Sequence, residues 1–323
     1  MNVLKKILMT LFALGTILWG CDSLIYDDLK DCPQGVYVKF YSKTPCASEP
    51  TFIGNVSNLH LFAFNEKDEL VSVTTQKDVS LSRDYEVLVP IRNGYYTFMG
   101  WAGVNDFFTL PDFKEGVTTK KDVMLTLKAA EKKAVSLGAH QVWYGTSPVV
   151  MLEDPSDIGS DFKHTDVNLQ EATNRINVEV EIHESIREDA DPKEFVVEIT
   201  SANGTMNIDG SMPLGSDILT YPSTTTYTQD GVKAQFTLMD LKTGYNNVLT
   251  VKNIKTDEII WKGDLIGSIL LKNEQVNLAC QHDFNVKFVI KDKCLDCWTY
   301  ICWAIYVNDW QIHSYETELG NDH

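Results

Sequence analysis

The sequence has 323 residues, of which 44% are hydrophobic and 23% are charged, a composition typical of a globular protein with about two domains. With 28 Lys and Arg against 45 Asp and Glu, the net charge is −17, so the protein's own field would repel nucleic acid phosphates. The composition therefore excludes a disordered chain, disfavours nucleic acid as a partner and names no activity.

The first residues have the pattern of an export signal. Lys5 and Lys6 precede an apolar run over residues 7–19, which is long enough for a secretory signal and too short to span a bilayer. The run ends in Leu18-Trp19-Gly20-Cys21, which resembles the lipobox of bacterial lipoproteins. We therefore predict a signal peptide over residues 1–20 and acylation of Cys21, with an unmodified signal peptide or a membrane-spanning helix as the alternatives.

A short acidic segment follows the predicted cleavage site. Residues 22–31 carry four aspartates and are predicted to form a solvated tether over residues 21–31, within which an outer-membrane export signal could also lie. Cleavage removes two lysines and no acids, so the mature chain carries a net charge of −19. Because anionic lipid repels such a body, its attachment should depend on the acyl chains.

The remaining chain alternates between apolar and polar residues with a period of two. In residues 176–182, four β-branched residues alternate with polar ones, as in a strand with one buried face. Similar alternation is present in residues 36–40, 123–127, 195–199 and 284–290, and Gly-containing turns separate the runs. The pattern predicts an all-β protein built from antiparallel β-sandwiches. Residues 129–137 suit a short helix, and residues 215–229, rich in Ser, Thr, Tyr and Pro, suit an edge strand with a loop.

One segment interrupts the strand pattern near the middle of the chain. Residues 153–170 are polar, contain Pro155 and Gly159, and precede the regular strand at Ile176. We expect the domain boundary there, with one β-sandwich over residues 32–165 and a second over residues 166–323.

The sequence offers no catalytic motif. His183-Glu184-Ser185-Ile186-Arg187 begins like a zinc-protease helix, but Arg187 cannot serve as the second zinc ligand. A Gly-x-Ser-x-Gly elbow and a phosphate-binding Gly-Lys-Ser/Thr loop are both absent from the sequence, and no carboxylate pair stands out for glycoside hydrolysis. We predict a non-enzymatic protein without a cofactor.

Two clusters suit a metal only partly. Asp154, Asp157 and Asp161 could supply oxygen ligands to calcium, but their spacing does not match an EF-hand, and a solvated acidic linker is the favoured interpretation. Cys294 and Cys297, with Cys302 close by, have the spacing of half a zinc site or of a thiol redox site. The second ligand pair is missing, and the strand context does not suit a redox pair at the start of a helix. We therefore expect no metal.

Six cysteines remain after Cys21, an even number that favours disulfides in an exported protein. The candidates are Cys32, Cys46, Cys280, Cys294, Cys297 and Cys302. The expected pairing is Cys32 with Cys46 and two bridges among the four C-terminal cysteines, with reduced structural thiols and metal ligation as the alternatives.

Aromatic residues gather in residues 95–101 and 298–310. Exposed rings could stack on sugars, whereas buried rings would fill the cores of the sandwiches. The second interpretation is favoured.

The order of these segments resembles the Bacteroidales fimbrial anchor and accessory lipoproteins. The similarity lies in Cys21, in Asp31-Cys32-Pro33-Gln34-Gly35 and the strand behind it, and in residues 56–64, 94–101, 174–178 and 305–310. It implies two tandem transthyretin-like β-sandwich domains and a role in anchoring fimbriae to the outer membrane, limiting their length or forming accessory subunits. The cysteines from Cys294 to Cys302 are not part of the resemblance.

The position of the first arginine bears on the role that this resemblance implies. Related polymerising fimbrillins lose their first strand to an Arg-specific protease, which opens a groove for a neighbour's donor strand. Here the first arginine after Cys21 is Arg83, so such a cut could not fall before or within residues 36–41. The first strand should therefore remain joined to the lipid.

Together these observations predict a surface-exposed lipoprotein of the cell outer membrane that anchors or terminates a pilus. Its partners would be fimbrial subunits, joined by β-strand addition, and outer-membrane lipid, joined through acylated Cys21. The main alternative is a surface lipoprotein that binds glycans, and a hydrolase on the periplasmic side is a third hypothesis.

Replacement of Cys21 by alanine should release the protein from the membrane fraction, because no other segment is predicted to hold a chain of net charge −19 at a lipid surface. The measurement is the amount of protein that sediments with outer membranes after a high-salt wash. A Cys21→Ala variant that still sediments would show that the lipobox interpretation is wrong.

Overall fold

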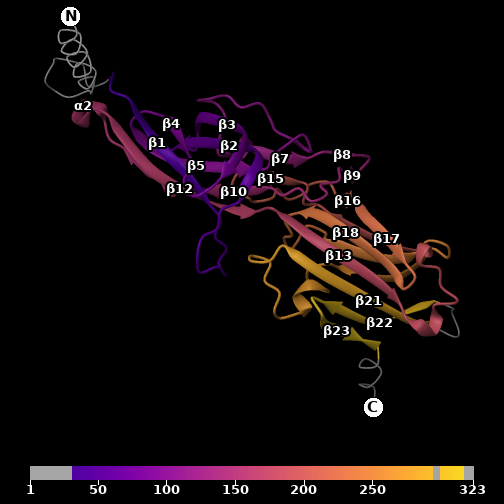
Figure 1. Cartoon of the computed structure of the whole chain (residues 1–323). Coiled ribbons are helices and arrows are strands. Elements are labelled where there is room, and N and C mark those ends of the chain that lie inside the picture. The colour runs from indigo at the N-terminus through magenta and orange to yellow at the C-terminus, as the bar shows by residue number, and fades with distance from the viewer. Residues whose placement is uncertain (1–30, 294–298, 316–323) are drawn as a thin grey trace, which may run out of the picture.

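The computed structural model describes residues 31–293 and 299–315, and nearly all regular structure in them is β. Figure 1 shows two β-rich halves that follow each other along an elongated molecule. The described chain begins at one end of this molecule, beside the short helix α2 (Pro155–Ile158). No helix in the described residues is long and apolar enough to cross a membrane.

The first half is built on one eight-stranded sheet. Its strands lie in the order β3-β2-β5-β10-β12-β1-β4, and β11 pairs with β5. Their bounds are β1 (Gln34–Tyr41), β2 (Gly54–Asn65), β3 (Leu70–Leu81), β4 (Glu86–Pro90), β5 (Gly94–Ala102), β10 (Trp143–Thr146), β11 (Val150–Leu152) and β12 (Asp161–Glu171). One face encloses a core to which β1 contributes Val36, Val38 and Phe40, all nearly inaccessible to solvent. The other face of β2 and β5 buries Phe62 against Trp101, with ring centroids 5.5 Å apart.

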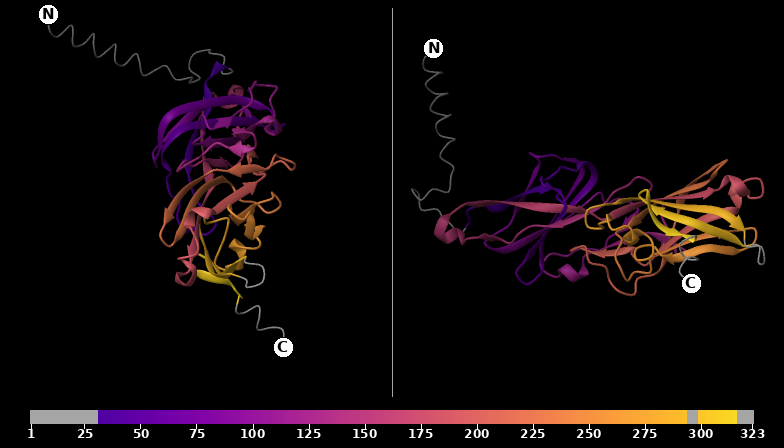
Figure 2. Two further views of the ribbon diagram at one scale, coloured as in Figure 1. Left: turned by 90° about the vertical axis from the view of Figure 1, so that its right-hand side faces the viewer. Right: turned by 90° about the horizontal axis from the view of Figure 1, so that it is seen from below.

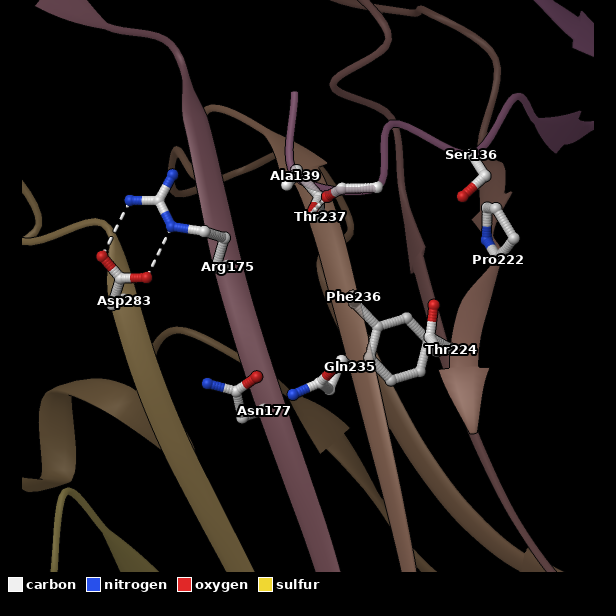
Figure 3. A pocket seen from close by; sticks show the side chains of 11 residues that line it. Ser136, Ala139, Arg175, Asn177, Pro222, Thr224, Gln235, Phe236, Thr237 and Asp283 are labelled. Atoms are coloured by element: carbon white, nitrogen blue, oxygen red, sulfur yellow. Dashed lines mark hydrogen bonds and ion pairs between the residues drawn. The ribbon is translucent and has the colours of Figure 1, made fainter. Parts of the chain in front are cut away.

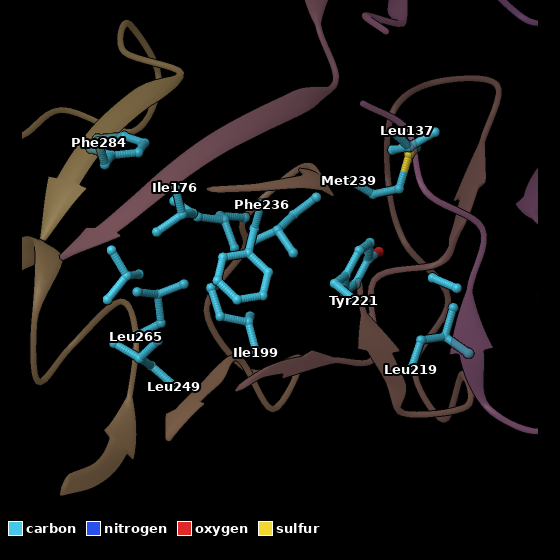
Figure 4. Close-up of a cluster of buried hydrophobic side chains, with 14 of the residues drawn as sticks. Leu137, Ile176, Ile199, Leu219, Tyr221, Phe236, Met239, Leu249, Leu265 and Phe284 are labelled. Carbon is cyan, nitrogen blue, oxygen red and sulfur yellow. The ribbon is translucent and has the colours of Figure 1, made fainter. Parts of the chain in front are cut away.

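The second half is a sandwich of two six-stranded sheets. One sheet has the order β17-β18-β13-β21-β22-β23 and the other β20-β19-β14-β16-β9-β8. Their strands are β8 (Ala129–Ala130), β9 (Lys133–Ala134), β13 (Thr173–Ile182), β14 (Phe195–Ser201), β16 (Leu219–Tyr221), β17 (Ser223–Thr228), β18 (Gly231–Met239), β19 (Val248–Asn253), β20 (Glu258–Asp264), β21 (Asp283–Lys293), β22 (Tyr300–Val307) and β23 (Trp310–Ser314). Figure 4 shows Ile176, Phe236 and Leu249 filling the space between the sheets, and all three side chains are buried.

The two halves exchange short strands. The hairpin β8–β9 comes from the first half of the chain and extends a sheet of the second half, where Lys133 pairs with Thr220. In return, β15 (Thr205–Asn207) pairs with β7 (Met124–Leu127) in a small sheet that also contains β6 (Phe108–Thr109). The junction between the halves is therefore made of backbone ladders from both.

The helix expected at residues 129–137 is wrong, and this exchange explains why. Ala129 and Ala130 form the first strand of the hairpin, and Glu131 and Lys132 both adopt positive φ in the turn. Two successive positive φ values suit a two-residue hairpin and are incompatible with an α-helix. Sheet pairing has overridden the helix propensity of the alanines.

The domain boundary expected after residue 165 falls inside β12, which runs from Asp161 to Glu171 and pairs with both β1 and β10. The polar residues that suggested a linker occupy its exposed face, whereas Thr165, Val167 and Leu169 are buried. Only Ala172 separates β12 from β13, so one central strand leads almost directly into the other.

A disulfide joins Cys46 to Cys280 across 234 residues, with the Cα atoms 5.9 Å apart. It links the loop between β1 and β2 to the segment that precedes β21. The expected bond between Cys32 and Cys46 is wrong, because Cys32 is buried where the chain enters β1 and Cys46 lies beyond its other end. A strand of this length separates its ends by about 26 Å.

This bond also rules out two bridges among the four C-terminal cysteines, since Cys280 is used elsewhere. Cys302 lies half-buried on β22, and burial raises the pKa of its thiol to about 12. A thiol of that pKa is a poor nucleophile at neutral pH, which argues against a redox site at Cys302. Cys294 and Cys297 lie outside the described residues.

Loss of the Cys46–Cys280 bond should lower the free energy of unfolding by about 2–5 kcal/mol, because the bond closes a very long loop of the unfolded chain. The measurement is denaturant unfolding of Cys46→Ser, Cys280→Ser and the double variant. All three should lose the same amount, since each lacks the same bond. A double variant that loses the sum of the two single effects would contradict this pairing.

Candidate functional site: the tethered strand and the open sheet edges

The first strand is held on both sides. β1 pairs in parallel with β12 over its whole length and antiparallel with β4 from Gly35 to Lys39. The Gln34 side chain also donates a hydrogen bond of 2.8 Å to the carbonyl of Glu153. Cys21, the predicted acylation site, lies outside the described residues, ten positions before residue 31.

Arg83 lies in the turn between β3 and β4, with its guanidinium 5.8 Å from the centre of the Phe52 ring. A cut there would fall after β1, β2 and β3. Strand β1 would still be bonded to β12, which comes from a distant part of the chain. Proteolysis at this arginine would therefore not detach the first strand.

The acidic cluster at the start of β12 has local structural roles. Asp154 caps α2 by accepting a hydrogen bond of 2.8 Å from the backbone N–H of Ser156. Asp161 is buried and forms an ion pair of 3.2 Å with Lys163. Among the described residues, no group of three His, Cys, Asp or Glu side chains is placed to hold a metal ion.

The motif that begins at His183 follows the end of β13. His183 Nδ1 accepts a hydrogen bond of 3.2 Å from the N–H of Ser185, at the start of the single turn η3 (Glu184–Ile186). Arg187 forms an ion pair of 3.0 Å with Asp230. The histidine therefore caps a turn.

The most enzyme-like cluster lies at the junction of the two halves, in a cavity of about 250 Å³. Burial raises the pKa of Asp240 against the opposing effect of Lys242, whose Nζ lies 3.5 Å away, and burial also raises the pKa of Tyr144. Lys242 lies 5.9 Å from the Tyr144 ring and donates to the carbonyl of Gly210. Tyr144, Asp240 and Lys242 thus contact one another where the two halves meet. This arrangement suits a structural contact between the halves.

A second cavity, of about 330 Å³, lies on the outer face of β13, β18 and β21 (Figure 3). Arg175 donates a hydrogen bond of 2.8 Å to Asp283 and pairs with Glu171, so Arg175 lowers the pKa of the Asp283 carboxyl. One row further along the strands, Asn177 donates to Asn285 at 3.0 Å. Arg175 is therefore shared between two carboxylates on this face, and Phe236, the aromatic residue of the lining, is buried.

The aromatic clusters mainly fill cores. Tyr96, Phe98 and Trp101 are buried, as expected for core filling. Five aromatic side chains are exposed in the described chain and lie on separate elements: Phe52, Tyr95, Phe162, Tyr227 and Trp310. They do not form the continuous flat row that stacking along a glycan would need.

Strand β17 is an open edge without protection. Its six residues, Ser-Thr-Thr-Thr-Tyr-Thr, carry no charge, and all except Ser223 are exposed. Its register with β18 runs without a bulge from Ser223 to Thr228. An unpaired, uncharged and regular strand presents N–H and C=O groups that another strand can pair with. The Ser- and Thr-rich composition of residues 215–229 had indicated an edge strand here.

The sheet edges at β20, β3, β4 and β23 are guarded. Strand β20 carries charges at both ends and a register shift where it pairs with β19. The exposed part of β3 contains Lys77 and Asp78, the latter with φ of 51°. Strand β4 is short and ends in Pro90, and β23 pairs with β22 through a register shift. Charges, bulges and proline are the devices that discourage a sheet edge from pairing with another chain.

Comparisons with known proteins agree with this architecture. The family described as fimbrillin-A associated anchor proteins Mfa1 and Mfa2 matches residues 29–316. The chain is 37% identical over 311 residues to the minor fimbrium anchoring subunit Mfa2 of Porphyromonas gingivalis, which covers 94% of each chain. The solved structure of the fimbrial anchor protein Mfa2 from that organism matches with a TM-score of 0.80 at 35% identity, over 88% of this chain and 100% of that one.

A more distant structure shares the fold. It is one of the putative polysaccharide binding proteins of Bacteroides thetaiotaomicron, with a TM-score of 0.72 at 20% identity, over 88% of this chain and 99% of that one. The family match covers both halves and the junction between them. The chain therefore belongs to the family of fimbrillin-A associated anchor proteins.

Proposed function

We propose that this protein is a lipid-anchored fimbrial subunit that anchors or terminates a pilus at the outer membrane. The observation that carries the proposal is 37% identity to a minor fimbrium anchoring subunit over 94% of both chains. This relationship indicates a non-enzymatic protein with a fimbrial accessory role at the cell surface or envelope. The lipid anchor and the termination of the pilus go beyond this relationship and are our proposal.

The position of β1 supports a terminal role. A subunit at the base must stay joined to the membrane while it holds the next subunit, so its first strand has to resist removal. Strand β1 is paired on both sides, and the first arginine of the mature chain lies beyond it. Acylation of Cys21 would then connect the lipid through the twelve residues 22–33 to a strand that is built into the core.

We propose further that the fimbrial partner adds a strand to the sheet edge at β17. Strand addition gains affinity from main-chain hydrogen bonds and specificity from alternate side chains. Strand β17 offers six residues without charge or bulge, whereas each of the other long edges carries at least one guard.

Glycan binding is the weaker candidate. The outer-face cavity near Arg175 has amides and paired charges that suit hydroxyl groups, but its lining has no exposed ring for a sugar to stack on. The polar groups that line this cavity could bind water as well as sugar hydroxyl groups.

The experiment that separates these candidates is deletion of the gene, followed by measurement of fimbrial length and of fimbriae shed into the medium. Loss of an anchor or terminator should give longer or shed fimbriae, and the unaltered gene should restore the original state. Unchanged fimbriae with lost binding to glycans would support the alternative.

Proline at β17 gives a sharper prediction. Of two neighbouring residues in an edge strand, one directs its N–H toward the paired strand and the other toward the open edge. Of the variants Thr225→Pro and Thr226→Pro, one therefore loses an N–H that points toward β18, and the other loses an N–H that points toward the open edge. The variant that loses the inward hydrogen bond should have a lower Tm.

The variant that loses the outward N–H should keep its Tm, and in the deletion strain it should restore membrane attachment of the protein without restoring fimbrial length and retention. The inward variant serves as its matched control for folding. If both variants restore normal fimbriae, the partner does not add its strand at β17.

A further inference from the structure

One end of the first half exposes several large apolar side chains. Here β1 begins, β4 ends at Pro90, residues 91–93 lead into β5, and α2 connects β11 to β12. Figures 1 and 2 show α2 at this end of the elongated molecule, beside the start of the described chain. The exposed residues, which we call the tip patch, are Leu88, Tyr95, Met151, Ile158 and Phe162, each between 41% and 52% accessible.

Strand register shows that the patch is confined to this end. On the outer face of β12, β1 and β4, the first row is Phe162, Gly35 and Pro90, and the second is His164, Tyr37 and Leu88. The Tyr37 and His164 rings stack with centroids 4.9 Å apart.

The third row on the same face is charged, and consists of Asp166, Lys39 and Glu86. Lys39 lies 3.9 Å from Glu86. The face therefore changes from apolar to charged within three rows, and the apolar rows lie at the end where the chain enters from its N-terminus.

Gly35 keeps the first row flat. A Cβ at this position would lie 2.9 Å from the Leu88 side chain and 2.9 Å from the Val89 carbonyl oxygen. The Leu88 side chain thus covers the glycine from β4, and Phe162 is the register partner of Gly35 on β12.

A second pair extends the patch around the tip. Tyr95 and Met151 are register partners on β5 and β11, on the outward face. Further along the same face of β5, Met99 and Trp101 are buried in the large hydrophobic core. Tyr95, at the start of the strand, is exposed. Ile158, the last residue of α2, lies in the sequence between Met151 and Phe162. Its side chain is 46% exposed.

The length of chain before the described residues limits what can reach this patch. Residue 31 lies ten positions after Cys21, and ten fully extended residues span at most about 35 Å. If Cys21 is acylated, residue 31, which lies at the same end of the molecule as α2, stays within that distance of Cys21. Large apolar and aromatic side chains are the residues that favour the membrane interface.

We propose that the tip patch rests on the lipid surface, so that the protein contacts the membrane directly as well as through its acyl chains. This inference rests on the proposed lipid anchor. The contact is apolar, since the described part of the tip exposes Glu153 and Asp157 beside Arg92 and holds no basic cluster that would attract anionic headgroups. It orients the long axis of the molecule relative to the membrane, as attachment through the acyl chains alone would not.

The test uses the mature chain, residues 22–323, with a hexahistidine tag in place of residues 1–21, bound to phosphatidylcholine vesicles that contain nickel-chelating lipid. The reporter is Phe162→Trp, and its matched control is Ile259→Trp on β20, an exposed position in the second half. The measurement is quenching of the added tryptophan emission by brominated phosphatidylcholine.

The emission added by Phe162→Trp should fall by about half, because interfacial side chains lie about 5–10 Å into the boundary between headgroups and acyl chains. The control should be unaffected, and a background change of Leu88→Ser with Tyr95→Ser should weaken the quenching. Phosphatidylserine in the vesicles should weaken it at low salt, with recovery at high salt, since the protein is acidic.

Equal quenching at residues 162 and 259 would overturn the tip contact, as would quenching that the serine substitutions leave unchanged. A protein that covers the patch in the cell would give this negative result with vesicles alone. Because the nickel lipid replaces the natural anchor, failure of Cys21 acylation would appear only in the membrane sedimentation experiment and would leave this result interpretable.

Discussion

The fold depends on the continuity of two central strands. Strand β12 lies between β10 and β1 in the sheet of the first half, and β13 lies between β18 and β21 in the second, with the buried Ala172 between them. Neither strand can move without disturbing ladders on both of its sides. The exchanged strands β8–β9 and β15 add further backbone pairing between the two halves. Figure 4 shows Leu137 of the first half beside Met239 of the second. The Cys46–Cys280 bond adds a covalent link across it. The halves therefore form one continuous body.

This continuity matters for a protein proposed to hold a pilus. A load between lipid and fimbria would enter through the tether and act lengthwise on β1. The eight residue pairs with β12 and five with β4 would then share it, because sliding β1 requires many hydrogen bonds to break together. From β12 the load would pass through Ala172 into β13, next to β18 and the open edge at β17. The proposed membrane contact and the proposed subunit contact thus lie on different halves, connected by paired strands.

The distribution of polar groups agrees with a structural protein. Two groups whose pKa values are raised by burial, Tyr144 and Asp240, lie where the halves meet, and the second is paired with Lys242. The half-buried Cys302 thiol is likewise held in its neutral form, because burial raises its pKa. Catalytic groups need perturbed pKa values together with access for a substrate, whereas these groups contact their own chain. Recognition would instead use the backbone at an edge and apolar side chains at the tip.

The sequence by itself determined the all-β class, because period-two alternation depends only on which residues face a core, and it is the basis on which we predict an export signal and a lipobox at Cys21. It also indicated an edge strand around residues 215–229. It failed at residues 153–170, where β12 shows its polar outer face, and at residues 129–137, where pairing with a distant strand outweighed local propensity. Tertiary structure alone decided that Cys46 meets Cys280, that the halves exchange strands and that five apolar side chains lie at the end where the described chain begins. Each of these features joins residues far apart in the chain, and strand pairing, not sequence spacing, brings such residues together.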